Sequence, residues 1–88
     1  MAATYQVQIL SLDETVYEGQ VSHLQARGSE GFLGILANHA PLVTELGKGP
    51  LTVDEADGGK KVFELQGGLL HVGGNKAIVL ADGKVEAK

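Results

Sequence analysis

Turn signals, many of them at glycine, recur along the whole chain about every 6 to 12 residues, and this spacing limits what the chain can fold into. The segments between the turns are too short for ordinary helices, and no window repeats its apolar residues with a 3.6-residue period. Short segments joined by tight turns are typical of strands. The sequence therefore predicts an all-β fold, either a sandwich or a flattened barrel.

The clearest strand signal lies near the N-terminus, where Tyr5, Val7 and Ile9 alternate with glutamines. An irregular order of apolar residues after Val21 predicts a β-bulge, and Gly19 is expected to separate two short strands. Asp-Gly at residues 57–58 predicts a hairpin. The run 77–80 is apolar on both faces, which is typical of a central or covered strand. The expected strands span 4–10, 15–17, 20–26, 32–36, 42–46, 51–53, 62–65, 69–72 and 76–81.

The size and charge of the chain limit its class. With 88 residues it has material for a single domain, 1–88, and without cysteine it has neither disulfides nor thiolate chemistry. The net charge of −4 and the lack of a basic run argue against nucleic acid as a partner. The apolar runs are too short to span a bilayer, and no signal peptide is recognisable, so we expect the chain to stay in the compartment where it is made.

No constellation of residues predicts catalysis. His23, His39 and His71 are the candidates for acid–base or metal chemistry, but no two of them have metal-ligand spacing. The glycine-rich stretch lacks the Lys-Ser/Thr of a phosphate-binding loop. We therefore expect no catalytic residue, no metal, no cofactor and no small-molecule substrate.

The stretch 28–42 reads Gly-Ser-Glu-Gly-Phe-Leu-Gly-Ile-Leu-Ala-Asn-His-Ala-Pro-Leu. Its glycines and its proline predict sharp bends around apolar side chains. Because Phe32 follows Gly31 in such a bend, burying its ring inside so small a core would be difficult. This stretch is interpreted as a docking surface.

Five blocks of the sequence together resemble the epsilon subunit of F-type ATP synthases: 4–10, 16–21, 28–42, 65–72 and 79–82. The resemblance implies a flattened β-sandwich of about ten short strands without an active site of its own. It also implies a place in the central stalk, or rotor, of a proton-translocating F-type ATP synthase, on the cytoplasmic face of the bacterial inner membrane. There the domain would clamp the gamma subunit to the c ring and couple rotation to ATP synthesis.

Site residues follow from the same resemblance, position by position. The residues expected to contact the c ring are Glu30, Gly31, Phe32 and Leu33. The residues expected to contact the gamma subunit are Ser11, His39, Thr44, Gln66 and His71.

The resembling family usually continues into two C-terminal helices, whereas this sequence ends at Lys88. The chain is therefore similar to a short form of the subunit without the helical hairpin, or to a truncated chain. An alternative from another class is a biotinyl- or lipoyl-type carrier domain, modified on Lys60 or Lys61 after the Asp-Gly turn.

Overall fold

The computed structural model describes residues 3–12, 14–28, 31–38 and 40–88. Over these residues the chain forms strands and no helix, which confirms the all-β prediction and comes close to the predicted number of about ten strands. The strands are β1 (Tyr5–Ser11), β2 (Glu14–Gly28), β3 (Gly31–Leu36), β4 (Leu42–Leu46), β5 (Gly49–Glu55), β6 (Lys60–Leu65), β7 (Gly68–Gly73), β8 (Lys76–Ala81) and β9 (Glu86–Ala87).

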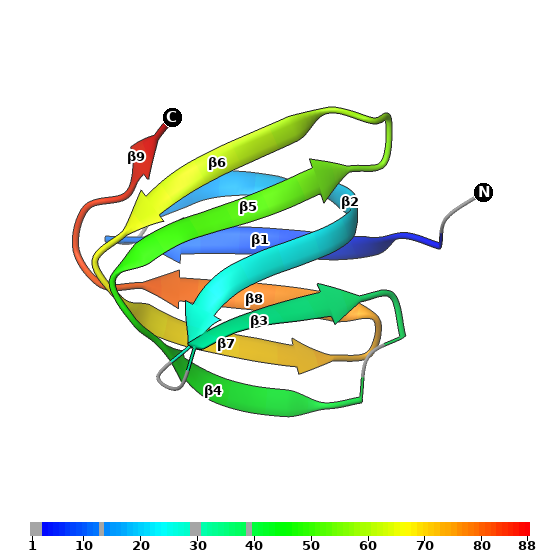
Figure 1. Cartoon of the computed structure of the whole chain (residues 1–88), viewed down its shortest axis with the longest axis horizontal. Helices are drawn as coiled ribbons and strands as arrows, with labels where there is room; N and C mark the ends of the chain where they lie inside the picture. Colours follow the sequence, from blue (N-terminus) through cyan, green and yellow to red (C-terminus); the bar gives the residue numbers. More distant parts are fainter. Residues whose placement is uncertain (1–2, 13, 29–30, 39) are drawn as a thin grey trace.

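The strands form two layers that share β2. In the first layer, β1 pairs with the first half of β2 on one side and in parallel with β8 on the other, and the layer continues through β7 to β4. In the second layer, the second half of β2 lies between β3 and β5, and the layer continues through β6 to β9. Figure 1 shows β2 curling from beside β1 to its place between β5 and β3. This arrangement is the expected flattened sandwich.

The long strand β2 differs from the sequence prediction, because Gly19 does not divide it. Gly19 stays in the ladder opposite Val7, with the Tyr17 side chain lying over it. The chain instead changes layers at a shift of register between Val21 and His23. A bulge bends its strand and increases its twist, which is what the passage from one layer to the other requires. The predicted bulge is confirmed, and the predicted division at Gly19 is wrong.

The core lies between the two layers. Tyr5, Val7 and Ile9 point into it, as their alternation predicts. The Tyr5 hydroxyl donates a hydrogen bond to the Ile35 carbonyl at 2.6 Å and so joins β1 of the first layer to β3 of the second. Burial raises the pKa of this hydroxyl well above its ordinary value, so the group stays a neutral donor. The other buried apolar side chains among the described residues are Val21, Leu24, Ala26, Ile35, Leu46, Leu51, Val53, Phe63, Leu65, Leu70, Val72, Ala77 and Val79.

The turns gather at two ends of the sandwich. At the end drawn on the left in Figure 1 lie the C-terminal ends of β1, β2, β4 and β6, and this end is called the tip end below. The β5–β6 hairpin lies at the opposite end, where the Gly59 N–H donates to the Asp57 carboxylate at 2.9 Å, which confirms the predicted Asp-Gly hairpin. Strand β8 lies between β1 and β7, as predicted for a central strand. Within the described residues, no helix is long and apolar enough to cross a membrane.

Candidate functional site

The β2–β3 hairpin presents an aromatic side chain at the tip end. Gly31 and Phe32 are exposed, and the Phe32 side chain is 56% exposed. The guanidinium of Arg27, the cross-strand neighbour of Phe32, lies 5.9 Å from the centre of the Phe32 ring. Leu33 points the other way and packs against the core. Of the predicted ring-contact residues, Gly31 and Phe32 share an accessible surface and Leu33 supports it, while Glu30 lies outside the described residues.

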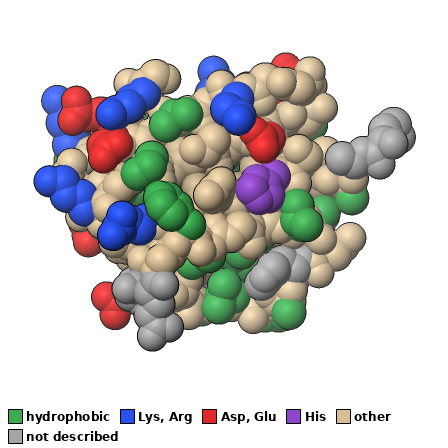
Figure 2. Space-filling view, in the orientation of Figure 1, with side chains coloured by type: hydrophobic (Ala, Val, Ile, Leu, Met, Phe, Trp, Pro, Cys, Tyr) green, Lys and Arg blue, Asp and Glu red, His purple; other side chains and the backbone are tan. Residues whose placement is uncertain are grey.

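This hairpin belongs to the layer that faces the reader in Figure 2. Hydrophobic side chains there lie among basic and acidic ones toward the tip end. In the same layer, Nδ1 of His23 on β2 lies 3.6 Å from a carboxylate oxygen of Asp54 on β5. The same carboxylate group lies 3.8 Å from the Lys60 ammonium. Among the described residues, no group of three or more potential ligands could hold a metal ion.

A second apolar surface lies on the outer face of the first layer. Leu80 of β8 is opposite Leu10 of β1 on one side and Leu69 of β7 on the other, so three leucines form a row across three strands. Leu80 is 47% exposed and Leu69 is 38% exposed. A second row lies beside it, because Ile78 is opposite His71, which in turn is opposite Val43. The six residues of the two rows, called the β8 patch, are Leu10, Leu69, Leu80, Val43, His71 and Ile78.

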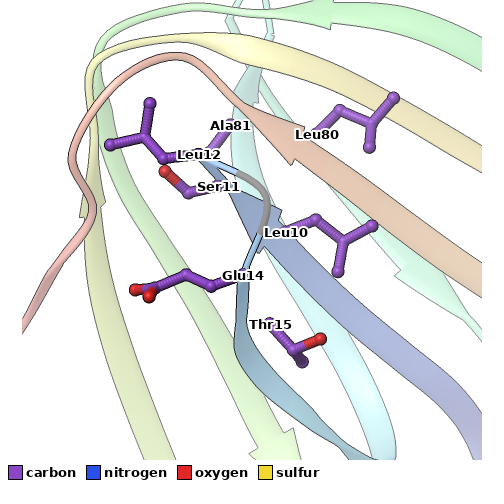
Figure 3. A pocket seen from close by; sticks show the side chains of 7 residues that line it. All are labelled: Leu10, Ser11, Leu12, Glu14, Thr15, Leu80 and Ala81. Atoms are coloured by element: carbon purple, nitrogen blue, oxygen red, sulfur yellow. The ribbon is translucent and has the colours of Figure 1, made fainter.

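A cavity of about 380 Å³ opens where the β8 patch reaches the tip end. Figure 3 shows Leu10 and Leu80 extending to the same side of their two neighbouring strands. Leu12, in the β1–β2 turn, also lines the cavity, is 73% exposed and has a φ of +49°. Left-handed backbone is unfavourable for leucine, so the turn holds an apolar side chain at the surface at some conformational cost. The cavity shares Leu10 and Leu80 with the β8 patch, so the two adjoin, although Ser11, Glu14 and Thr15 also line the cavity.

The structure does not bring the four described residues that were predicted to contact gamma into one surface. His71 is exposed within the β8 patch, and Gln66 is exposed in the β6–β7 turn at the tip end. Thr44 is half-buried on β4, opposite the buried Leu70. Ser11 is buried, and its hydroxyl donates to the Gly83 carbonyl, although the residue also lines the cavity at the tip end. The remaining residue, His39, lies outside the described residues, and all five contacts stay predictions.

Sequence reasoning missed the leucine row. The available signal was Leu10, which follows Gln6 and Gln8 on what is otherwise the polar face of the first strand. A second signal was Leu80, in the run that is apolar on both faces. The pairing of their strands could not be read from the sequence, because β1 and β8 are neighbours in the sheet but lie far apart in the chain.

Comparison with known proteins agrees with the fold. Residues 4–87 match the family model described as the beta-sandwich domain of the ATP synthase delta/epsilon chain. The chain belongs to this family. This delta/epsilon sandwich is 44% identical over 85 residues to each of two proteins named ATP synthase epsilon chain, from Psychrobacter sp. (strain PRwf-1) and from Acinetobacter baylyi (strain ATCC 33305 / BD413 / ADP1).

The delta/epsilon sandwich spans only part of these relatives. The matched region covers 97% of this chain but 62% and 61% of the two curated proteins. Among solved structures, a chain of the Euglena gracilis mitochondrial ATP synthase, OSCP/F1/c-ring in rotational state 1, aligns with a TM-score of 0.90 at 25% identity, covering 99% of this chain and 55% of that one. A chain of the Tetrahymena thermophila mitochondrial ATP synthase central stalk/c-ring aligns with a TM-score of 0.75 at 19% identity over 96% of this chain and 66% of that one, which supports the fold alone.

Family membership also bears on the carrier-domain alternative. Lys60 begins β6 and faces Asp54 across the strand pair, and Lys61 lines a groove of about 240 Å³ beside Tyr17 and Phe63. The match over nearly the whole sandwich favours an ATP synthase subunit over a domain modified on either lysine.

Proposed function

We propose that this chain is a non-catalytic rotor subunit of a proton-translocating F-type ATP synthase, which clamps the gamma subunit to the membrane c ring and couples rotation to ATP synthesis. The proposal is supported by the curated relatives, which are named ATP synthase epsilon chain. It is further supported by the solved Euglena gracilis relative, whose assembly is titled as containing OSCP, F1 and the c-ring.

The observation that carries the proposal is the presence of two apolar surfaces on opposite layers of one sandwich. Exposed apolar areas of this kind mark sites where proteins associate. We assign the hairpin tip, with Glu30, Gly31, Phe32 and Leu33, to the c ring. We assign the β8 patch and its surroundings to the gamma subunit, and retain as contact candidates Ser11, His39, Thr44, Gln66 and His71.

The strand β2 gives this arrangement a mechanical rationale. It pairs with β1 in the first layer, crosses at the bulge, and ends in the hairpin that carries Phe32. A force applied at the hairpin therefore passes along one covalent strand, hydrogen-bonded to neighbours in both layers, into the layer that carries the β8 patch. The close-packed core between the layers resists shear, because packed interiors have low compressibility.

A clamp of this kind works by contact alone. We infer that the chain has no active site of its own and uses no substrate or cofactor, because neither torque nor attachment requires bond chemistry. We also infer that it lies peripherally at the cytoplasmic face of a bacterial inner membrane, held there through the gamma subunit and the ring.

The decisive experiment is reconstitution of proton-coupled ATP synthesis from a complex with and without this chain. We expect coupling to fall when the chain is omitted and to return when it is added back. Unchanged coupling in its absence would refute the proposal.

The two surfaces can be tested separately by capture of the purified gamma subunit and of the purified c ring. Leu80→Glu should weaken capture of gamma and leave ring binding intact, and Phe32→Ala should do the reverse. Ala56→Glu is the control, because Ala56 is an exposed apolar residue in the β5–β6 hairpin, at the opposite end of the sandwich from the hairpin tip and outside both surfaces. Equal losses in all three variants would show that neither surface is specific.

A further inference from the structure

Arg27 holds an unusual position in this chain. It is the only arginine in the sequence, and it is the penultimate residue of β2, with its side chain on the exposed face of the strand. Its cross-strand neighbour is Phe32, and the guanidinium lies 5.9 Å from the centre of that ring. A guanidinium over an aromatic face is a favourable arrangement that also limits the freedom of both side chains.

The stem of Arg27 is held in place by the β4–β5 turn. A Cβ atom added at Gly49 would lie 3.2 Å from Cδ of Arg27 and 3.6 Å from its Cβ, so glycine at this position lets the arginine stem lie close against the backbone. The Gly47 N–H donates a hydrogen bond to the Arg27 carbonyl at 2.8 Å. The turn thus fixes both the main chain and the stem, and the head group is directed toward Phe32.

Arg27 forms no ion pair with another residue in the described part of the domain. The ion pairs there join His23 and Lys60 to Asp54, and Lys88 to Glu64, and none of them involves the arginine. A guanidinium offers five N–H donors in a planar fork that matches a carboxylate or a phosphate. A held, exposed and unneutralised arginine beside an exposed aromatic ring is therefore complementary to an anion bordered by apolar surface.

The overall charge distribution favours a protein carboxylate over a membrane. Recognition of anionic lipids uses clusters of several Lys and Arg residues, whereas this chain has a net charge of −4 and a single arginine at the hairpin. Lipid headgroups also offer no fixed apolar neighbour for the Phe32 ring. A carboxylate side chain in a folded partner can supply both features at once.

We propose that Arg27 is a specificity-determining residue of the hairpin, and that it pairs with a carboxylate of the c ring while Phe32 packs against apolar surface beside that carboxylate. This inference rests on the proposed attachment to the ring. It adds the chemistry of the contact: a positive charge and an aromatic ring on this chain, and a negative charge with an apolar border on the partner.

The first test is binding of the chain to the purified c ring over a series of salt concentrations. Arg27→Met keeps an apolar stem over Gly49 and removes the charge, and we expect it to weaken binding roughly tenfold at low salt and to flatten the salt dependence. The affinity of Arg27→Lys for the ring should lie between those of the wild type and Arg27→Met. Lys76→Met is the matched control, because Lys76 is an exposed cation at the opposite end of the sandwich, and its removal should change binding little.

The second test identifies the anion. Exposed carboxylates of the ring are amidated with a water-soluble carbodiimide and an amine, and binding of the wild-type and Arg27→Met chains is compared on treated and untreated rings. If Arg27 pairs directly with a ring carboxylate, amidation should weaken ring binding by the wild-type chain and have little further effect on ring binding by Arg27→Met. Independent, additive losses would overturn the pairing, as would an Arg27-dependent attachment to protein-free anionic vesicles.

The outcomes separate this inference from the proposed function. If the wild-type chain does not bind the ring at all, ring attachment fails and the inference fails with it. If the wild type binds and Arg27→Met binds equally well with the same salt dependence, ring attachment stands and only the role of Arg27 is refuted. Urea unfolding of both variants confirms that the comparison is made between folded proteins.

Discussion

The two phenylalanines of the chain provide an internal comparison between a docking residue and a core residue. Phe32 is 56% exposed, whereas Phe63 is 4% exposed and packs its ring 5.5 Å from that of Tyr17. Replacing a buried phenylalanine by alanine costs about 3–5 kcal/mol. Since less than half of the Phe32 side chain is buried, the same change there should cost about 1–2 kcal/mol.

The measurement is urea unfolding of the wild type, Phe32→Ala and Phe63→Ala. A domain of this size has a free energy of unfolding of roughly 4–13 kcal/mol, so Phe63→Ala should lose a large share of its stability and Phe32→Ala should stay well folded. The midpoint should shift with an unchanged slope in the Phe32 variant. A loss of more than about 3 kcal/mol in Phe32→Ala would show that its ring is core in solution, and would refute the reasoning that makes it a docking residue.

Three further predictions concern the sandwich itself. Tyr5→Phe removes the hydroxyl that donates to the buried Ile35 carbonyl at 2.6 Å, and it should lower the free energy of unfolding by about 1–3 kcal/mol in thermal or chemical unfolding. An unchanged stability would contradict a structural role for the hydroxyl. Burial raises the pKa of Tyr17 to about 12, so the Tyr17 hydroxyl keeps its proton to higher pH in the folded state than in the unfolded state. The contribution of this hydroxyl to the free energy of unfolding should therefore be complete below about pH 10 and decline toward pH 12. The decline should be smaller in Tyr17→Phe, and an identical pH profile in the two proteins would refute this prediction. Gly68→Ala places a Cβ 2.4 Å from a carbonyl oxygen of β8 at a φ of +153°, and it should lower the free energy of unfolding by more than about 2 kcal/mol. Gly73→Ala has open space around the new Cβ and should lower the free energy of unfolding by less than about 1 kcal/mol. Equal losses in the two variants would disprove the steric argument.

The secondary structure was largely predictable, because it depends on local signals. The alternation at Tyr5, Val7 and Ile9 and the Asp-Gly hairpin after β5 appear where the sequence predicts them. Gly19 misled the prediction, since glycine is common in turns but is also tolerated in a strand whose neighbours hold it in a ladder. The length of β2 depends on pairing with β1, β3 and β5, which no local pattern reveals.

The candidate surfaces were predictable only in part. The exposure of Phe32 follows from its place after Gly31, and the structure agrees. The β8 patch depends on strands β1, β8, β7 and β4 lying side by side. Of the described residues predicted to contact gamma, His71 is exposed within this patch, whereas Ser11 is buried. Ser11 in particular is buried, and its hydroxyl donates a hydrogen bond to the carbonyl of Gly83, which lies 72 positions away in the chain.

By itself, the sequence determined that these residues form short strands joined by tight turns, because those features follow from alternation and from turn chemistry within a few residues. Only the tertiary structure decided which apolar side chains remain at the surface and which strands share a face. The physical reason is that burial and strand order depend on contacts between distant segments. One strand, β2, passes from one layer to the other, and so joins the hairpin that carries Phe32 to the layer that carries the leucine row.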